Sequence, residues 1–158
     1  MNIVLNRIDE RLIHGQVLVS WAKKLSVQRI VIADDRCAED ALAKTVLSLS
    51  VPMGIELKIL SCRDALSYLQ ADGCGGPPNT ILLTRSPRAL KYLWDNGYRP
   101  DCANIGGMAA GAGRSQLCRG VFMSEEERRI LRDMQRDGMD IYIQTVYADT
   151  KMPLSKFL

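Results

Sequence analysis

Short apolar runs alternate with amphipathic stretches along the chain, and this alternation is the main indication of its fold. The apolar runs lie at residues 3–5, 30–33, 55–60, 81–83, 103–105, 121–122 and 141–143. Several of them consist almost entirely of Ile, Val and Leu, which is typical of parallel strands covered on both faces. We therefore predict a strand at each of these seven positions.

Between the strands, apolar residues recur at three- and four-residue spacing, the period of an α-helix. One such stripe consists of Ala38, Ala41, Leu42, Thr45, Val46 and Leu49, and others lie at 17–25, 65–69, 89–94 and 130–134. Gly97 and Gly138 are predicted to end the last two helices. The run from Ser124 to Glu127 has the sequence of a capping box, which predicts a helix start there.

Strands that alternate with helices form right-handed βαβ units. The pattern predicts an α/β fold, with an open, doubly wound, mainly parallel sheet, helices on both faces, and a single domain over residues 1–158. Two segments depart from the alternation. Residues 73–78 are predicted to form a surface turn, and residues 106–114 contain four glycines and no helical stripe.

Composition adds few constraints. The chain is 47% hydrophobic and 25% charged, which is ordinary for a globular protein, and its net charge of +3 is too weak to indicate nucleic acid. Residues 85–119 hold six basic and two acidic side chains. This local excess fits either an acidic or phosphorylated partner or a solvated face.

Several kinds of site are not indicated. The five cysteines form no C-x-x-C pair, and with a single histidine a zinc site is not expected. The sequence has neither a G-x-x-x-x-G-K-[S/T] nor a G-x-G-x-x-G motif, so we expect no nucleotide, cofactor or metal. No apolar run approaches the ~18 residues of a membrane span, and we expect a cytoplasmic protein with reduced thiols.

His14, the only histidine, lies where the first strand is predicted to give way to the first helix. Its spacing from Leu18 and Trp21 also places it on the apolar face of that helix, so a packed structural histidine is the alternative to a functional one. A helix start offers free N–H groups to anions, and Gly15 permits close approach of another group. Arg11, three residues before His14, carries a guanidinium suited to phosphate.

These parts favour a histidine that handles a phosphoryl group. Neutral imidazole is a competent nucleophile toward phosphorus. Helix amides and Arg11 are expected to hold the equatorial oxygens of an in-line transition state. The loops after the strands at 30–33, 81–83 and 103–105 should open on the same edge of the sheet as His14.

The segment around His14 resembles the phosphorylation-site segment of IIB components of the bacterial sugar phosphotransferase system, mannose/sorbose class. It runs Arg7-Ile8-Asp9-Glu10-Arg11-Leu12-Ile13-His14-Gly15-Gln16-Val17. Weaker resemblances follow at Trp21, at Asn104-Ile105-Gly106-Gly107-Met108, at Gly113-Arg114-Ser115-Gln116-Leu117 and at the helix start after Ser124. The run Arg85-Ser86-Pro87 departs from the Thr-Asn-Pro that relatives often have there.

The resemblance implies a phosphotransferase in which His14 accepts phosphate from a phosphohistidine of a IIA protein or domain. His14 then donates it to a sugar that enters through the membrane proteins IIC and IID, with Arg11 as the transition-state arginine and Nδ1 as the favoured acceptor nitrogen. Such a protein is cytoplasmic and associates with the inner face of the membrane. We expect Gly15, Gln16, Arg7 and Asp9 around the phosphate, and Gly106, Gly107, Met108, Asp34 and Ser86 as a site wall or docking surface.

Two other functions remain as alternatives. A receiver domain of two-component signalling has the same kind of sheet, but its acidic pair should follow the first strand, whereas Asp34 and Asp35 follow the second. We expect that pair to form a turn and a helix cap. An adaptor module would keep the fold and use His14 only structurally.

Overall fold

Seven strands form one sheet in the computed structural model, which describes residues 1–71 and 76–158, the side chains of Gln16 and Val17 excepted. Its strand order is β3-β2-β4-β1-β5-β8-β9. The strands are β1 (Asn2–Ile8), β2 (Arg29–Ala33), β3 (Glu56–Leu60), β4 (Asn79–Thr84), β5 (Cys102–Ile105), β8 (Asp140–Ile143) and β9 (Met152–Pro153). The first six pair in parallel, and only β9 is antiparallel.

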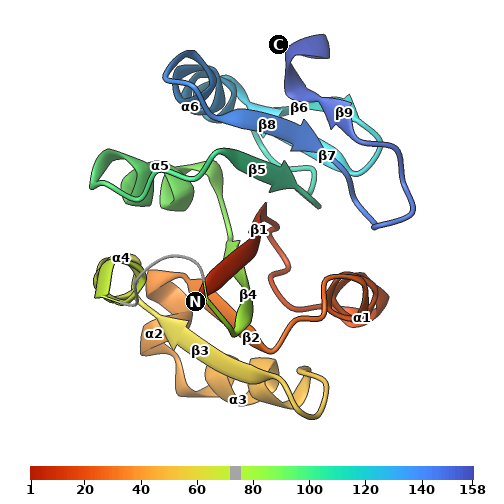
Figure 1. The fold of residues 1–158 in the computed structure, drawn as a ribbon. Helices are drawn as coiled ribbons and strands as arrows, with labels where there is room; N and C mark the ends of the chain where they lie inside the picture. Colours follow the sequence, from red (N-terminus) through yellow and green to blue (C-terminus); the bar gives the residue numbers. More distant parts are fainter. Residues whose placement is uncertain (72–75) are drawn as a thin grey trace.

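Helices cover both faces of this sheet. They are α1 (Gly15–Lys24), α2 (Asp35–Glu39), α3 (Ala41–Leu49), α4 (Cys62–Ala71), α5 (Pro87–Asp95), α6 (Glu125–Arg136) and a 3-10 turn at Leu154–Lys156. In Figure 1, α4, α5 and α6 lie along one side of the sheet, and α1 lies on the other. The predicted doubly wound, mainly parallel α/β fold is confirmed.

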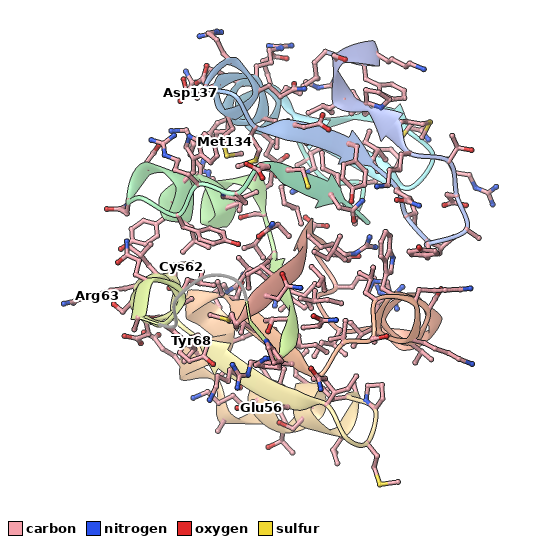
Figure 2. All side chains as sticks on the ribbon, viewed as in Figure 1. Glu56, Cys62, Arg63, Tyr68, Met134 and Asp137 are labelled. Atoms are coloured by element: carbon pink, nitrogen blue, oxygen red, sulfur yellow. The ribbon has the colours of Figure 1, made fainter. Side chains whose placement is uncertain are left out.

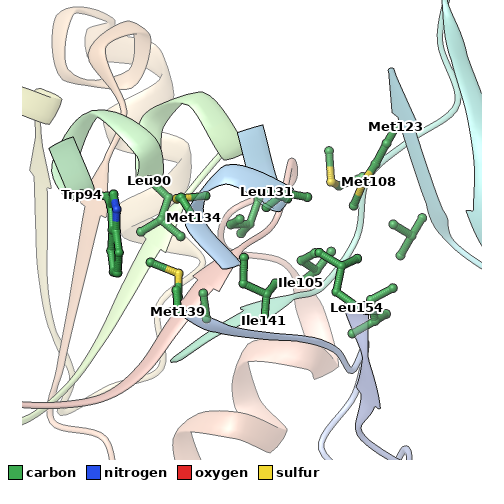
Figure 3. Close-up of a cluster of buried hydrophobic side chains, with 14 residues drawn as sticks. Leu90, Trp94, Ile105, Met108, Met123, Leu131, Met134, Met139, Ile141 and Leu154 are labelled. Atoms are coloured by element: carbon green, nitrogen blue, oxygen red, sulfur yellow. The ribbon is translucent and has the colours of Figure 1, made fainter. Parts of the chain in front are cut away.

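The core divides between the two faces. Strand residues such as Leu5, Ile30 and Ile81 pack with Leu18 and Trp21 of α1 on one face. On the other face, α5 and α6 enclose the cluster in Figure 3, which includes Leu90, Trp94, Met108, Met123, Leu131, Met134, Met139 and Ile141. Because the central strands are buried on both faces, their sequences are continuous apolar runs rather than alternating ones.

All seven predicted strands are present, and the run at 121–122 is β7. Two further strands, β6 and β9, were missed. A hairpin of β6 (Arg114–Cys118) and β7 (Val121–Ser124) stands outside the main sheet, and β9 adds a two-residue edge. β6 is polar and half exposed, so its sequence carries no apolar run. β9 is too short to show a pattern.

The predicted helix over 38–49 is wrong in two respects. The chain forms two helices, because Asp40 is extended and its carboxylate accepts a hydrogen bond from the Ala43 amide as the N-cap of α3. The stripe is also not the packed face. Leu42, Val46 and Leu49 are 73%, 53% and 83% exposed, whereas Leu47 is buried. Tertiary packing therefore selects a different side of α3 from the one that the spacing indicates.

Helix ends follow the sequence signals closely. Ser124 and Glu127 form the predicted capping box at the start of α6. Asp34 caps α2 by accepting a hydrogen bond from the Cys37 amide, which confirms the capping role expected for the acidic pair. Gly97 and Gly138 follow α5 and α6 with φ of 103° and 106°, a conformation that favours glycine. The predicted turn at 73–78 lies partly outside the described residues.

Charged side chains line the edge strand β3. Glu56 accepts a hydrogen bond from Nε of Arg29 at 2.7 Å and contacts the Lys58 ammonium at 3.0 Å, and both basic groups lie over the ring of Tyr68. Figure 2 labels Glu56 and Tyr68 at this border of the sheet. Charges on an edge strand discourage pairing with another chain. Within residues 1–71 and 76–158, no helix is long and apolar enough to cross a membrane.

The parallel strands bring several loops to one edge. The connections after β1, β2, β4, β5 and β8 all begin at the carboxyl end of the sheet. β1 lies at the centre between β4 and β5, and its helix α1 lies on the opposite face from α5. In sheets of this type, ligands bind where neighbouring strands send their helices to opposite faces. This position is next to the loop that carries His14.

Candidate functional site

The loop of residues 9–14 joins the end of β1 to the start of α1. The Leu12 amide donates to the Asp9 carbonyl at 3.0 Å, which closes a tight turn. Leu12 has a φ of 54°, an uncommon conformation for a branched residue, and its side chain is buried in the core. The left-handed conformation costs about 1–2 kcal/mol, which the burial of the leucine side chain offsets. The loop therefore has a defined shape.

His14 is the N-cap residue of α1, and its ring is anchored by one nitrogen. Nε2 lies 3.1 Å from Oδ2 of Asp9, and the side chain is 15% exposed. Because a carboxylate only accepts hydrogen bonds, Nε2 carries the proton in this pair. In the neutral ring, Nδ1 then has the free lone pair. His14 is thus neither a wholly buried core residue nor a freely rotating surface one.

Arg7 binds Asp9, and all of the N–H donors of its guanidinium make hydrogen bonds. Its Nε and Nη2 donate to Oδ2 of Asp9 at 3.3 and 2.9 Å. Nη1 donates to Oδ1 of Asn104 at 2.5 Å and to the Gln144 carbonyl at 3.0 Å, and Nη2 also donates to the Thr145 carbonyl at 2.8 Å. The five N–H groups of the guanidinium therefore all have acceptors.

This ion pair is buried, with side chains of Arg7 and Asp9 that are 3% and 0% exposed. Burial lowers the pKa of Arg7 from its ordinary value, and the Asp9 carboxylate partly offsets that effect. A buried pair is stable only when its remaining hydrogen bonds are satisfied. The strand ends of β5 and β8 supply those partners, so His14 depends on a network that spans three strands.

Gly106 makes room for the pair. A Cβ at this position would lie 2.2 Å from Nη2 of Arg7 and 2.6 Å from Oδ2 of Asp9. Gly107 is also close, since a Cβ there would lie 3.5 Å from Oδ1 of Asp9, and its carbonyl accepts from the Glu10 amide. The start of the glycine-rich segment therefore packs directly against the carboxylate that orients His14.

Arg11 differs from Arg7 in the exposure and in the pairing of its side chain. Its side chain is exposed, and it makes no hydrogen bond or ion pair with another described residue, although its amide donates to Oδ1 of Asp9. The N-terminus of α1 has no side-chain cap. A free guanidinium and uncapped helix amides thus lie on either side of His14 in the sequence, and both attract anions.

Two further arginines brace the same loop. Arg114 donates to the carboxylates of Glu10 and Glu127, and Glu10 also accepts from the Ala109 amide at 2.7 Å. The contact joins the loop to the β6–β7 hairpin and to the capping box of α6. Desolvation raises the pKa of Glu127, but the hydrogen bonds from Arg114 and from the Ser124 amide outweigh it and leave the pKa below its ordinary value.

On the opposite flank, Arg85 donates to the Glu10 carbonyl at 2.9 Å, to Oδ2 of Asp34 at 2.9 Å and to Sγ of Cys37 at 3.0 Å. Desolvation raises the pKa of Asp34, but the hydrogen bonds from the Cys37 amide and Arg85 outweigh it and leave the pKa below its ordinary value. Much of the basic excess in residues 85–119 is therefore paired within the molecule, and those charges are not free for a partner.

The structure brings together only some of the residues expected at the site. His14, Asp9, Arg7, Gly106 and Gly107 form the contacts described above, and Gly15 opens α1 with a φ of 37°. Arg7 offers no free donor to a phosphate. The side chain of Gln16 lies outside the described part of the chain.

The other residues expected in the wall make no hydrogen bond or ion pair with His14 or Asp9 in the described part of the chain. Met108 is fully buried in the core beside α6, so its side chain faces no solvent. Ser86 caps α5 through the Ala89 amide and, with Asp34, lines a separate cleft of about 370 Å³ at the starts of α2, α4 and α5. No cluster of metal-ligating side chains exists among the described residues.

Asn104, Glu10 and Arg114 stand in the runs that resemble the family, but no supporting role was expected for them, and Gln144 was not singled out. Asn104 and Gln144 each follow the pattern of a polar residue at or just beyond a buried strand end, which is a usable signal in a parallel sheet. Glu10 and Arg114 carry no such signal. Their contact joins positions 104 residues apart, and it exists only because the hairpin folds back against the loop.

The fold and the sequence together define a class of protein, the small α/β components of sugar phosphotransferase systems. The chain belongs to the family described as the PTS system sorbose subfamily IIB component, whose model matches residues 3–158. Members of this family are phosphotransferase components, and the chain is of that general kind.

Individual relatives and solved structures agree with the membership of the chain in this family. The sorbose-specific EIIB component of Klebsiella pneumoniae is 30% identical over 149 residues, covering 94% of this chain and 90% of the relative. The mannose-specific EIIAB component of Escherichia coli K12 is 29% identical over 154 residues, and the match spans 98% of this chain but only 47% of that relative's length. The crystal structure of the IIBSor domain of the Klebsiella pneumoniae sorbose permease has a TM-score of 0.89 at 28% identity, covering 99% and 95% of the two chains.

We expect Gly106→Ala to disturb the Arg7–Asp9 pair that orients His14. The added methyl group overlaps the guanidinium of Arg7, which five hydrogen bonds hold in place, so the pair must shift or separate. Overpacking of this kind costs about 1–3 kcal/mol. Urea denaturation should give a lower midpoint, and NMR of the His14 ring should show a changed environment at Nε2.

Gly76→Ala is the matched control, since a Cβ at Gly76 meets nothing within 4 Å. It should leave both measurements at their wild-type values. Wild-type stability and an unchanged His14 spectrum in Gly106→Ala would contradict the argument that the glycine is required by the buried pair.

Proposed function

We propose that this protein is a phosphoryl carrier of a phosphoenolpyruvate-dependent sugar uptake system. His14 accepts a phosphoryl group from a phosphohistidine of a IIA protein or domain and donates it to a sugar that enters through IIC and IID. The observation that carries the proposal is the hydrogen bond between Nε2 of His14 and Asp9, which leaves Nδ1 as the nucleophile.

In the first step, the lone pair on Nδ1 attacks the phosphorus of the donor phosphohistidine. A new P–N bond forms as the donor's P–N bond breaks, and the donor imidazole leaves with its electron pair. The His14 ring gains positive character during the transfer, and the Asp9 carboxylate at Nε2 stabilises it. Arg11 and the uncapped amides of α1 supply donors to the equatorial oxygens.

In the second step, a sugar hydroxyl oxygen attacks the same phosphorus. The P–N bond to Nδ1 breaks, its electron pair returns to the ring, and the hydroxyl proton is released. Neutral His14, with the proton still on Nε2, is restored. Because Asp9 fixes the ring through the nitrogen that does not react, the same orientation serves both steps.

The proposal places the protein in the cytoplasm, in contact with IIA and with IIC and IID at the inner face of the membrane. Relatives named for mannose, sorbose and N-acetylgalactosamine match this chain at similar identity, 28–30%. Sequence identity therefore selects none of these sugars for this protein.

The direct test uses radiolabelled phosphoenolpyruvate, the two general phosphotransferase proteins and a IIA. We expect wild type to take up label that is stable in alkali and lost in mild acid, as a phosphoramidate is. His14→Ala should take up none while it keeps the wild-type unfolding midpoint. Phosphorus–nitrogen NMR should assign the phosphoryl group to Nδ1.

Other outcomes identify other functions. Label on an aspartate, cleaved by hydroxylamine, would indicate a receiver-like module. A His14→Ala variant that fails to fold, together with a wild type that takes up no label, would indicate an adaptor with a structural histidine. Phosphate on Nε2 would contradict the role given to Asp9.

We expect Arg11→Ala to slow phosphoryl transfer about 100-fold or more, as removal of one transition-state donor does elsewhere. Arg11→Lys should restore only part of the rate, because an ammonium lacks the two-pronged geometry of guanidinium. Single-turnover transfer from phospho-IIA measures this step. Lys23→Ala, at a basic residue in the last turn of α1, is the control. Equal rates in Arg11→Ala and wild type would assign Arg11 a surface role only.

The glycine-rich segment is proposed as a wall of the phosphoryl site and part of the surface on which IIA docks. Its start touches Asp9, and the Asp34 and Ser86 loops open at the same edge. Amide chemical shifts of Gly106, Gly107 and Met108 should move when IIA is added or when His14 is phosphorylated. Shifts confined to the loops at 34–36 and 85–87 would move the docking surface to those loops.

A further inference from the structure

The segment of residues 144–149, which follows β8, is a compact loop whose shape depends on one side chain. Gln144 is 4% exposed, and its Nε2 donates hydrogen bonds to the carbonyls of Tyr147 and Asp149 at 2.9 and 2.8 Å. A further bond closes the far end of the loop, where the Asp149 amide donates to the Val146 carbonyl at 3.0 Å. The side-chain amide of Gln144 therefore ties the start of the loop to its end.

The main chain at the start of this loop supports the buried ion pair that orients His14. The carbonyls of Gln144 and Thr145 accept hydrogen bonds from Arg7 at 3.0 and 2.8 Å. They account for two of the five hydrogen bonds of the guanidinium, and two others go to Asp9. The position of the Asp9 carboxylate, and with it the orientation of the His14 ring, therefore depends on where the loop holds these carbonyls.

The same loop also contacts the helix that begins directly after His14. Tyr147 packs edge-on against Trp21 of α1, with ring centroids 5.1 Å apart. The guanidinium of Arg7 lies 5.6 Å from the centre of the same Trp21 ring. The loop of residues 144–149 is thus in contact with both elements that place His14, which are the ion pair at Nε2 of its ring and the helix α1.

We propose that Gln144 is a positioning residue for phosphoryl transfer, an inference that rests on the proposed function. Its Nε2 donates only to the loop, so it acts on His14 through Arg7 and Asp9. While the loop is fixed, Asp9 accepts a hydrogen bond from Nε2 of His14, and Nδ1 keeps the lone pair that attacks phosphorus. Once the loop is free to move, the carboxylate shifts and the ring also populates the tautomer with the proton on Nδ1, which is not a nucleophile.

The substitution Gln144→Met tests this role in the transfer itself. Met has a similar length and no amide, so it removes both hydrogen bonds to the loop. It also removes Oε1, a buried acceptor without a partner in the described part of the chain, which limits the loss of stability. We expect single-turnover transfer at saturating phospho-IIA to fall about 10- to 100-fold, the effect of a small displacement of a reacting group. The phospho-IIA concentration that gives half the maximal rate should stay within about 2-fold of wild type.

Nitrogen-15 NMR of the His14 ring gives the readout that a merely structural role would not move. It is recorded on the full, unphosphorylated chain, so it does not depend on the relay. In wild type we expect the neutral ring to carry its proton on Nε2. In Gln144→Met we expect a mixture of the two neutral tautomers, together with a shift of the Nε signal of Arg7.

Gln70→Met is the matched control, because Nε2 of Gln70 also donates to a main-chain carbonyl, that of Asn96, at 3.1 Å. This contact joins the ends of α4 and α5, at the opposite edge of the sheet from His14, so the control should keep the wild-type rate and tautomer. Tyr147→Leu is a second variant of the loop, at an exposed position where the fold tolerates the change. It removes the ring contact with α1, and we expect a smaller fall in rate with some mixing of the tautomers.

A wild-type rate and a wild-type tautomer in both loop variants would overturn the inference. A lower rate with the ring still protonated on Nε2 alone would also overturn it, since the loop would then act in docking of IIA and not on His14. If Gln144→Met does not fold, the result for Tyr147→Leu decides between these outcomes. A wild type that takes up no label from phospho-IIA overturns the relay, whereas the tautomer measurement still decides whether the loop orients His14.

Discussion

The buried ion pair between Arg7 and Asp9 is the interaction on which the site depends. It lies at the end of the central strand β1, and its hydrogen bonds reach β5 through Asn104 and the end of β8 through Gln144 and Thr145. A pair so buried is not by itself a strong source of stability, because desolvation offsets the attraction of the charges. Its effect is geometric. It fixes a carboxylate at one position, and that carboxylate fixes the ring of His14.

The two arginines of the loop illustrate how burial divides their roles. Arg7 has no free donor, so it acts on the histidine only through Asp9. Arg11 is exposed and its side chain pairs with no other residue in the described part of the chain, so its guanidinium keeps its capacity for an incoming anion. A carrier that receives and releases a phosphoryl group needs both properties: a rigid support that stays the same in every state, and a charged group that is free to engage and disengage.

The contacts of Glu10 and the packing of Leu12 also fix the shape of the loop of residues 9–14. Arg114 of the β6–β7 hairpin donates to the Glu10 carboxylate, and Arg85, which follows β4 of the main sheet, donates to the Glu10 carbonyl, so Glu10 is fixed from two sides. Leu12 keeps an unfavourable backbone conformation only because its side chain is packed in the core. The packing of Leu12 and the contacts of Glu10 together hold the loop in one shape, which reduces the ordering that docking of the proposed IIA partner would require.

The sequence by itself determined the six parallel strands of the sheet, most helix ends, the parallel topology and the position of His14 at a strand–helix junction, because periodicity and caps are local properties of the chain. It also supplied the family, through the run around His14. It placed both Arg7 and Arg11 near the phosphate and did not show that every donor of Arg7 is used within the fold. Nor did it show that Met108 is core, that Leu42 and Leu49 are exposed, or that Gly106 is needed as room for a guanidinium. These outcomes depend on which residues meet across β1, β5 and β8. Burial and contact between positions about a hundred residues apart are decided by packing, and only the tertiary structure contains that information.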